Sequence, residues 1–290
     1  MYKVIADSGS TKTDWVIIDS NSEIVEKIKT IGFNPYFQTA EFIFNEIFKS
    51  FSKSKLDLDK VTEIHYYGAG CSSTERTTVV KNGLQPQFLK ARIYVNHDMI
   101  AAARATLGNG DGIACILGTG ANSCVWEDSE EKANIASHGY IFGDEGSGSH
   151  LGIELLKLYL SDKMDDELKK SFENEFKLSK DQILNTTYKE SSPNVFLASF
   201  AYFYHANLHH KVLRDIIYKG FKNFFEVRIV PYPNFNSYEL GFVGSIAFYY
   251  DEILKEVASE YGMSIKKITR CPIEELTEFH SDNQTVKQLG

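Results

Sequence analysis

The sequence of 290 residues has few of the residues that build metal clusters or nucleic-acid surfaces. Its four cysteines include no CxxC pair, which argues against a thiolate metal site or an iron–sulfur cluster. Its apolar runs are too short to span a bilayer, and its first residues do not resemble a signal peptide. With 31 Lys and Arg against 39 Asp and Glu, a nucleic-acid partner is not expected. We expect a soluble, cytoplasmic protein with reduced thiols.

Hydrophobic residues make up 43% of the sequence, which is enough to form packed cores. The length corresponds to about two domains. One pattern occurs twice: a buried strand, a turn of small residues and a returning strand. The buried strands are residues 2–6 and 112–117. We interpret this as two copies of one α/β unit, residues 1–107 and 108–290. Residues 151–220 are rich in Leu, Phe and Tyr and predict a helical insertion in the second copy.

The first of the two turns, Asp7 to Asp14, has a composition that suits phosphate binding. Small residues let backbone amides approach phosphate oxygens, and a lysine adds positive charge. Asp7, at the end of the strand, can hold Mg²⁺ through water. A polar hairpin turn without a ligand explains this segment equally well when it is taken alone. The predicted phosphate ligands are Ser8, Gly9, Ser10, Thr11 and Lys12.

The second turn is Gly118-Thr119-Gly120, and alone it is a weak signal, since such turns are common. Two small-residue turns that each close a hairpin are a stronger signal together than either one. We therefore expect them to grip the phosphates of one nucleotide from both sides.

Asp98 follows a predicted strand over residues 91–95 and precedes an alanine-rich helix. A carboxylate at this place can accept the proton of an attacking hydroxyl in phosphoryl transfer. It can also simply cap the helix, and both roles are compatible.

Two further glycine-rich segments are candidate ligand loops. Residues 143–149 place Asp144 and Glu145 between glycines, where they can bind sugar hydroxyls or lie near a metal, although a solvated turn is the plain alternative. Gly244 and Ser245 stand in a segment that lets an adenine or ribose lie against the backbone.

In the order of these five motifs, the sequence resembles the BadF/BadG/BcrA/BcrD-type ATPase family, and within it the N-acetylglucosamine kinases of the actin-like superfamily. The resemblance covers most of residues 1–160 and returns at 240–250. It implies an α/β fold with two RNase H-like lobes around a nucleotide cleft, and ATP and Mg²⁺ as cofactors. It also implies that Asp98 is the catalytic base, that the two turns bind phosphates and that Gly244 and Ser245 meet the nucleoside.

The same resemblance implies an amino-sugar substrate, most simply N-acetylglucosamine phosphorylated at its 6-hydroxyl, and a homodimer. N-acetylmuramic acid is an alternative substrate, and His138 stands where animal N-acetylglucosamine kinases carry Trp. A second alternative is an ATPase that activates a reductase or dehydratase, since Cys115 and Cys124 flank the second turn. The implied sugar contacts are Asn34, Asn122, Gly139, Asp144 and Glu145.

One histidine pattern has the spacing of metal ligands. His205 and His209 are four residues apart on a predicted helix, and His210 follows. The spacing suits a metal, but no HExxH motif and no further ligand are apparent in the sequence, so no metal site is predicted here.

Overall fold

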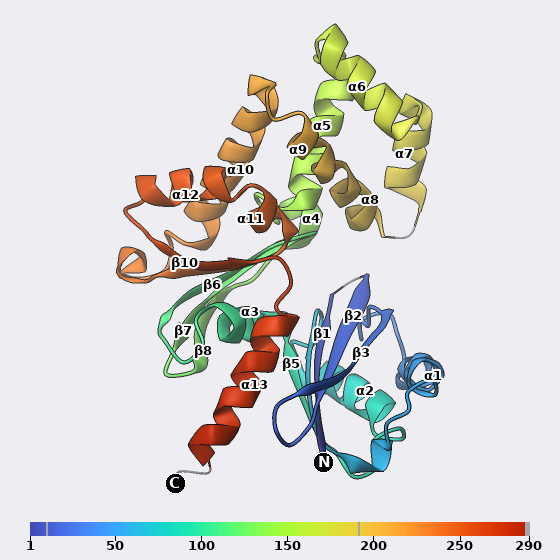
Figure 1. Cartoon of the computed structure of the whole chain (residues 1–290). Coiled ribbons are helices and arrows are strands. Elements are labelled where there is room, and N and C mark those ends of the chain that lie inside the picture. The colour runs from blue at the N-terminus through green and yellow to red at the C-terminus, as the bar shows by residue number, and fades with distance from the viewer. Residues whose placement is uncertain (10, 191, 288–290) are drawn as a thin grey trace. The chain divides into compact units, whose positions relative to one another are not determined.

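The computed structural model describes residues 1–9, 11–190 and 192–287, and the chain divides into two compact units (Figure 1). The first unit is Met1–Gly108 with Cys271–Gly290, and the second is Asn109–Arg270. The units differ from the predicted ranges in one respect, since the C-terminal helix α13 (Ile273–Lys287) groups with the first unit. The physical reason is burial: Ile273 and Leu276 pack in the same apolar cluster as Ile5.

The first unit is built on a five-stranded sheet in the order β3-β2-β1-β4-β5. β1 pairs antiparallel with β2 and parallel with β4, and β4 pairs parallel with β5. The carboxyl ends of β1, β4 and β5 therefore lie at one edge of the sheet. The strands are β1 (Tyr2–Ser8), β2 (Lys12–Ile18), β3 (Ile24–Ile31), β4 (Val61–Gly68) and β5 (Arg92–His97).

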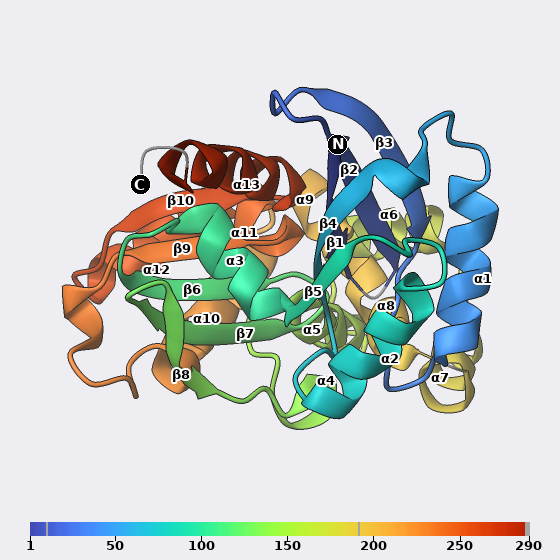
Figure 2. The same cartoon turned by 90° about the horizontal axis from the view of Figure 1, so that it is seen from below.

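Helices cover both faces of this sheet, as Figures 1 and 2 show. Because side chains alternate along a strand, Val4 and Ala6 join one apolar cluster and Ile5 joins another. The first cluster contains α1 (Ala40–Phe51) and α2 (Thr74–Leu84), with a short 3-10 turn at Leu58–Lys60. The second contains α3 (Asp98–Thr106) and α13.

The second unit repeats the sheet of the first, in the order β8-β7-β6-β9-β10. Its central strand β6 again pairs antiparallel with the next strand and parallel with a later one. The predicted repetition of one α/β unit is therefore confirmed. β8 was not predicted, because its mostly exposed residues at the sheet edge read as a solvated face. The strands are β6 (Gly112–Leu117), β7 (Ala121–Glu127), β8 (Glu130–Ile135), β9 (Leu240–Val243) and β10 (Ile265–Thr269).

The predicted helical insertion lies between β8 and β9, and it is longer than expected at both ends. The helix expected to carry both His205 and His209 is an error of the prediction, since α9 ends at Ala206 and α10 begins at Lys211. α10 and α12 pack together over one face of the sheet (Figure 1). The helices are α4 (Gly139–Phe142), α5 (Gly148–Leu160), α6 (Asp166–Phe176), α7 (Lys180–Lys189), α8 (Pro193–Ser199), α9 (Phe203–Ala206), α10 (Lys211–Arg228), α11 (Ser245–Tyr249) and α12 (Asp251–Glu260), with 3-10 turns at Phe200–Tyr202 and Phe235–Ser237.

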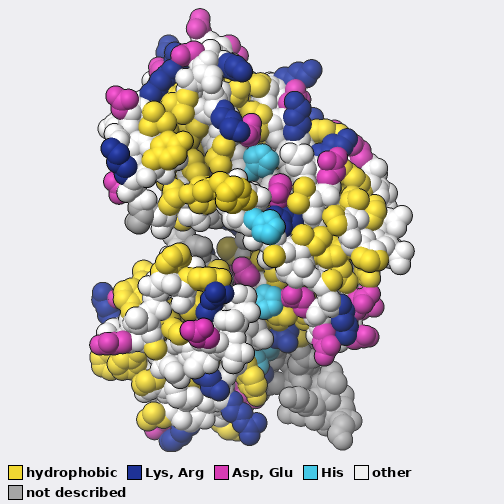
Figure 3. Space-filling model, turned by 180° about the vertical axis from the view of Figure 1, so that it is seen from behind, with side chains coloured by type: hydrophobic (Ala, Val, Ile, Leu, Met, Phe, Trp, Pro, Cys, Tyr) yellow, Lys and Arg dark blue, Asp and Glu magenta, His cyan; other side chains and the backbone are white. Residues whose placement is uncertain are grey.

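The surface carries charges of both signs. On the face drawn in Figure 3, Lys and Arg side chains are interspersed with Asp and Glu rather than gathered in one area. Among the described residues, the model contains no helix of the length and apolar character that crossing a membrane requires.

A glycine in α5 tests the packing of the insertion. A Cβ at Gly152 would lie 1.8 Å from the backbone oxygen of Leu197 in α8, so Gly152→Ala forces the two helices apart. We expect a loss of about 1–3 kcal/mol in the free energy of unfolding, measured by urea denaturation.

Gly220→Ala in α10 is the matched control, because its Cβ would meet its nearest atom at 3.4 Å, an ordinary contact. Equal stability of the two variants would contradict the close packing of α5 on α8.

Candidate active site

The edge of the first unit's sheet at which β1, β4 and β5 end brings two predicted acids together. The register pairs Ser8 with Gly68 and Gly68 with His97, so Asp7 near the end of β1 and Asp98 just after β5 lie at the same edge. Asp14 is the antiparallel partner of Asp7 on β2. Asp98 is also the first residue of α3, where the helix dipole favours negative charge. The fold therefore places three carboxylates close to one another at this edge.

Electrostatics at this edge disfavour a third negative charge. Burial and then the nearby carboxylates of Asp14 and Asp98 together raise the pKa of Asp7 to about 7, against a smaller opposing effect of Lys12. Lys12 does not cancel them because its ammonium donates to Asp14 at 2.5 Å, and this bond raises the pKa of Lys12. A cation bound here would offset the repulsion.

Ser8 connects the first turn to the segment that carries Asn34. Its hydroxyl shares a hydrogen bond of 2.8 Å with the Thr13 hydroxyl and accepts from the backbone N–H of Phe33 at 3.1 Å. Asn34 follows directly and lies against Gly70, where a Cβ would come within 2.6 Å of its Oδ1. Asn34 is thus held beside the turn that follows β4, at the edge that bears the acids.

The remaining residues of the first turn are only partly described. The backbone N–H of Gly9 donates to the Lys12 oxygen at 3.0 Å and closes the hairpin. Thr11 is exposed at the tip. Ser10 lies outside the described residues, and its role as a phosphate ligand stays a prediction.

In the second unit, the Gly118–Gly120 turn is tied to the start of α5. The N–H groups of Gly148 and Ser149 donate to the oxygens of Gly118 and Thr119, at 2.8 and 3.1 Å. Among the hydrogen bonds of the described residues, the N–H groups of Thr119 and Gly120 donate to no partner. Two unpaired amides on a glycine turn are suitable donors for phosphate oxygens.

The 143–149 loop is fixed from two sides. Asp144 Oδ1 accepts from the N–H of Ala121 at 3.0 Å and from the Ser137 hydroxyl at 2.6 Å. Glu145 accepts from Nε of the buried Arg228 at 3.0 Å. Asp144 and Glu145 therefore position this loop on the turn, and any contact with a substrate adds to that role.

Sequence reasoning missed Arg228, which is 1% exposed and also donates to the backbone oxygens of Ile135 and Ala136. Its signal in the sequence was weak, since it is a single arginine at the end of a helix that otherwise buries apolar residues.

Gly244 joins the same edge of the second sheet. Its φ is +126°, and a Cβ there would lie 2.2 Å from the Leu117 oxygen, so only glycine lets this turn run against the end of β6. Ser245 follows as the first residue of α11. The structure thus brings Gly244 to the start of the Gly118–Gly120 turn, and the nucleoside contact of Gly244 and Ser245 stays a prediction.

Two predicted sugar contacts lie close by in the chain. Asn122 on β7 is partly buried, and its Oδ1 accepts from the N–H of Ser123 at 2.9 Å. Gly139, which begins α4, is exposed and donates to the Ser137 hydroxyl at 3.2 Å. Ser137 therefore links Gly139 to Asp144.

The cysteines that motivated the redox alternative are both fully buried. Burial raises the pKa of the Cys115 thiol well above its ordinary value, and the neighbouring Cys124 adds to this. A cluster needs accessible thiolates, so this environment does not favour an iron–sulfur site.

A groove of about 1180 Å³ on the first unit lies away from Asp7 and Asp98. It runs beside β5 and is lined by side chains that include His65, Tyr94, Arg104 and His280. Neither Asp7 nor Asp98 lines it, so its size gives no argument for the active site.

Comparison with solved structures identifies the class of fold. A ROK family glucokinase from Streptomyces griseus, solved with glucose and AMPPNP, matches with a TM-score of 0.57 over 99% of this chain and all (100%) of that chain. At 15% identity this likeness shows the fold alone. The predicted fold, with two RNase H-like units of the actin-like ATPase class, is confirmed.

The family follows from the sequence. The family model of the BadF/BadG/BcrA/BcrD ATPase family matches residues 6–206, and the chain belongs to this family. A candidate N-acetylglucosamine kinase from Porphyromonas gingivalis is 34% identical, with a TM-score of 0.91 over 97% of this chain and 99% of that one. An N-acetylmuramic acid/N-acetylglucosamine kinase of Clostridium acetobutylicum is 24% identical over 164 residues, and that match spans 53% of its length.

The raised pKa of Asp7 gives a prediction about stability. An acid whose pKa rises from 3.8 to about 7 on folding destabilises the folded state as the pH passes from about 4 to 7. Asp7→Asn removes this cost, so we expect its Tm at pH 8 to exceed that of the native protein by several degrees, since 1 kcal/mol shifts the Tm of a chain of this size by about 2–4 °C. At pH 4 the two should unfold at nearly the same temperature.

Differential scanning calorimetry at the two pH values measures this effect. Asp19→Asn, on the turn after β2, is the control for loss of one carboxylate. A Tm difference for Asp7→Asn that is the same at both pH values would contradict the assigned repulsion.

Proposed function

We propose that this protein is an ATP-dependent kinase that phosphorylates a hydroxyl of an N-acetylated amino sugar. The specific reaction that we propose is the conversion of N-acetylglucosamine to N-acetylglucosamine 6-phosphate. The proposal rests on one observation: Asp98, Asp7 and Asn34, from separate strands and loops, lie at the same edge of the first unit's sheet. The names of two similar proteins, each an N-acetylglucosamine kinase or candidate kinase, support the same substrate class.

Asp98 is the proposed general base. A kinase needs a carboxylate that accepts the proton of the acceptor hydroxyl while the oxygen attacks the γ-phosphoryl group. Asp98 stands at the start of a helix, where its negative charge is favoured. The oxygen of the sugar forms the new P–O bond, the bond to the leaving ADP oxygen breaks, and the proton goes to Asp98.

The residues present fit a magnesium ion at the same edge. Burial and repulsion from Asp14 and Asp98 raise the pKa of Asp7, and a divalent cation bound beside these three carboxylates would offset their negative charge. Asp7 would hold the ion through water. When bound, Mg²⁺ neutralises charge on the phosphates of the nucleotide.

The phosphates of ATP are assigned to the turns. The unpaired N–H groups of Thr119 and Gly120 supply donors in the second unit, and Lys12 and Thr11 supply them in the first. Gly244 and Ser245 are proposed to contact the nucleoside, because Gly244 lies against the backbone of Leu117 and Gly118.

Asn34, Asn122, Gly139, Asp144 and Glu145 are proposed to lie around the sugar. Asn34 offers the amide group that an N-acetyl oxygen or a ring hydroxyl can meet. The alternative acceptor is N-acetylmuramic acid, which the Clostridium acetobutylicum protein is named for as well. A cytoplasmic location and a homodimer stay predictions.

Asp98→Asn tests the base. We expect kcat to fall by about 10²–10⁴-fold, while KM for ATP and for sugar changes little, because the amide keeps the shape of the side chain but accepts no proton. A coupled assay of ADP release measures both constants.

Asp181→Asn is the matched control, since Asp181 is an exposed carboxylate on α7. Normal turnover by Asp98→Asn would sink the assignment of the base, whereas the family membership would stand.

The substrate is tested by a panel of acceptors. We expect ADP release with N-acetylglucosamine to exceed that with glucose and glucosamine by at least tenfold, because an N-acetyl contact worth one good hydrogen bond contributes about 1.4 kcal/mol. N-acetylmuramic acid distinguishes the alternative. If no sugar raises ADP release above the rate with water, the kinase proposal fails.

A further inference from the structure

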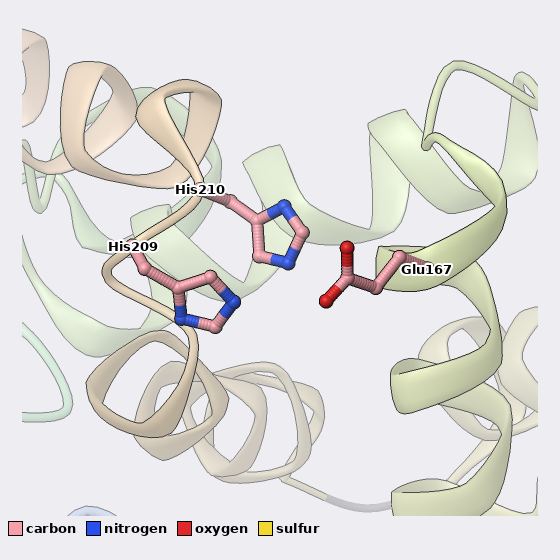
Figure 4. Close-up of side chains that lie close together, drawn as sticks. All are labelled: Glu167, His209 and His210. Carbon is pink, nitrogen blue, oxygen red and sulfur yellow. The ribbon is translucent and has the colours of Figure 1, made fainter.

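A cluster of metal-ligating side chains occurs in the helical insertion, outside the residues assigned to the active site. Glu167 extends from the first turn of α6, and His209 and His210 belong to the segment between α9 and α10. One donor atom of each residue lies within 4.8 Å of the others. Figure 4 shows the Glu167 carboxylate pointing toward the two imidazole rings, which lie side by side.

The arrangement differs from the one weighed in the sequence. His205 does not join the cluster, because its ring packs against Tyr249 and Tyr250, at centroid distances of 5.5 and 6.4 Å. The partner of His209 is instead the adjacent His210, at a ring distance of 4.3 Å, together with a carboxylate from another helix.

The two segments that carry the ligands are fixed to each other independently of the cluster. Leu168 and Phe172 are fully buried and anchor α6 in the core. The hydroxyl of Ser171 on α6 donates to Asn207 Oδ1 at 3.1 Å. The backbone oxygen of Asn207 accepts from the backbone N–H of His210 at 3.0 Å. The ligands are therefore presented by a preformed scaffold.

A second carboxylate orients one of the histidines. Asp165 Oδ2 lies 3.6 Å from Nδ1 of His210, and Asp165 Oδ1 accepts from the N–H of Leu168 at 2.8 Å. An Nδ1–H that faces a carboxylate leaves Nε2 available as a ligand, which is the common arrangement around metal-binding histidines. His210 is buried enough that its side chain is only 10% exposed.

We infer that Glu167, His209 and His210 bind a divalent transition-metal ion, and that zinc suits this set of two imidazoles and a carboxylate. Bonds of about 2.0–2.2 Å place tetrahedral ligands roughly 3.3 Å apart. The ligand atoms now lie within 4.8 Å of one another, and the exposed side chains of Glu167 and His209 must rotate to bring them to this shorter spacing. Water completes the coordination, and the ion ties α6 to the start of α10.

This site is distinct in chemistry from the magnesium site proposed for the kinase. Imidazole ligands favour zinc and its neighbours, whereas magnesium prefers oxygen ligands and its own waters. Magnesium added with ATP should therefore leave the site to the transition metal.

The test is a titration of metal-free protein with Zn²⁺, followed by isothermal calorimetry in a buffer that does not bind zinc. We expect one Zn²⁺ per chain, and an affinity that falls at least tenfold in Glu167→Gln and in His209→Gln. His205→Gln is the matched control, a neighbouring exposed histidine outside the cluster, and its affinity should equal that of the native protein. Circular dichroism confirms that each variant is folded.

A second readout uses Co²⁺ in place of zinc. Visible absorption typical of a four-coordinate site should appear in the native protein and be lost in Glu167→Gln. Native affinity in both Glu167→Gln and His209→Gln, or no binding of Zn²⁺ to the native protein, would overturn the inference. Because the readout is metal binding, it stands or falls separately from the proposed kinase activity.

Discussion

The parallel pairing of β1, β4 and β5 is the constraint on which the proposed chemistry depends. It brings the ends of three strands to one edge, and with them Asp7 and Asp98, which are far apart in the sequence. The cost is visible in the pKa of Asp7, which burial, together with repulsion from Asp14 and Asp98, raises to about 7. A cation that binds beside these carboxylates relieves their repulsion, and this relief contributes to its affinity. The same arrangement underlies both the proposed magnesium ion and the proposed base.

The second unit has the same strand order, and its proposed phosphate-binding groups are backbone amides. Its turn at 118–120 is held by the start of α5, whose N–H groups donate to the carbonyl oxygens of the turn. The amides that remain unpaired are those best placed for an anion. Asp144 and Arg228 then fix the 143–149 loop against β7 and β8. Preorganisation of this kind lowers the cost of ordering the loop when a ligand binds.

Much of the fold could be predicted because its signals are local. Strand β6 has the predicted bounds, since a buried apolar run depends on a few adjacent residues. The repetition of the unit was visible from its two hairpin turns. The edge strand β8 was missed because an exposed strand lacks an apolar face. The C-terminal helix was assigned to the second copy because chain order gives no sign of where a helix packs.

The candidate site shows the same limit. Glycines, hydroxyls and acids in short motifs could be read from the sequence, and the structure brings Gly244 to the Gly118–Gly120 turn. Arg228 and the cluster of Glu167, His209 and His210 could not, since each depends on contacts between distant segments. The role of Ser8 as a phosphate ligand stays a prediction, and the sequence did not indicate that its hydroxyl contacts Phe33 and Thr13.

The most direct test of the central claim is a crystal structure with magnesium, a non-hydrolysable ATP analogue and N-acetylglucosamine. The account predicts that the 6-hydroxyl of the sugar lies within hydrogen-bonding distance of the Asp98 carboxylate, with Asp7 contacting a water of the magnesium ion. A sugar whose hydroxyls all lie away from Asp98, or a magnesium ion bound away from Asp7, would contradict it.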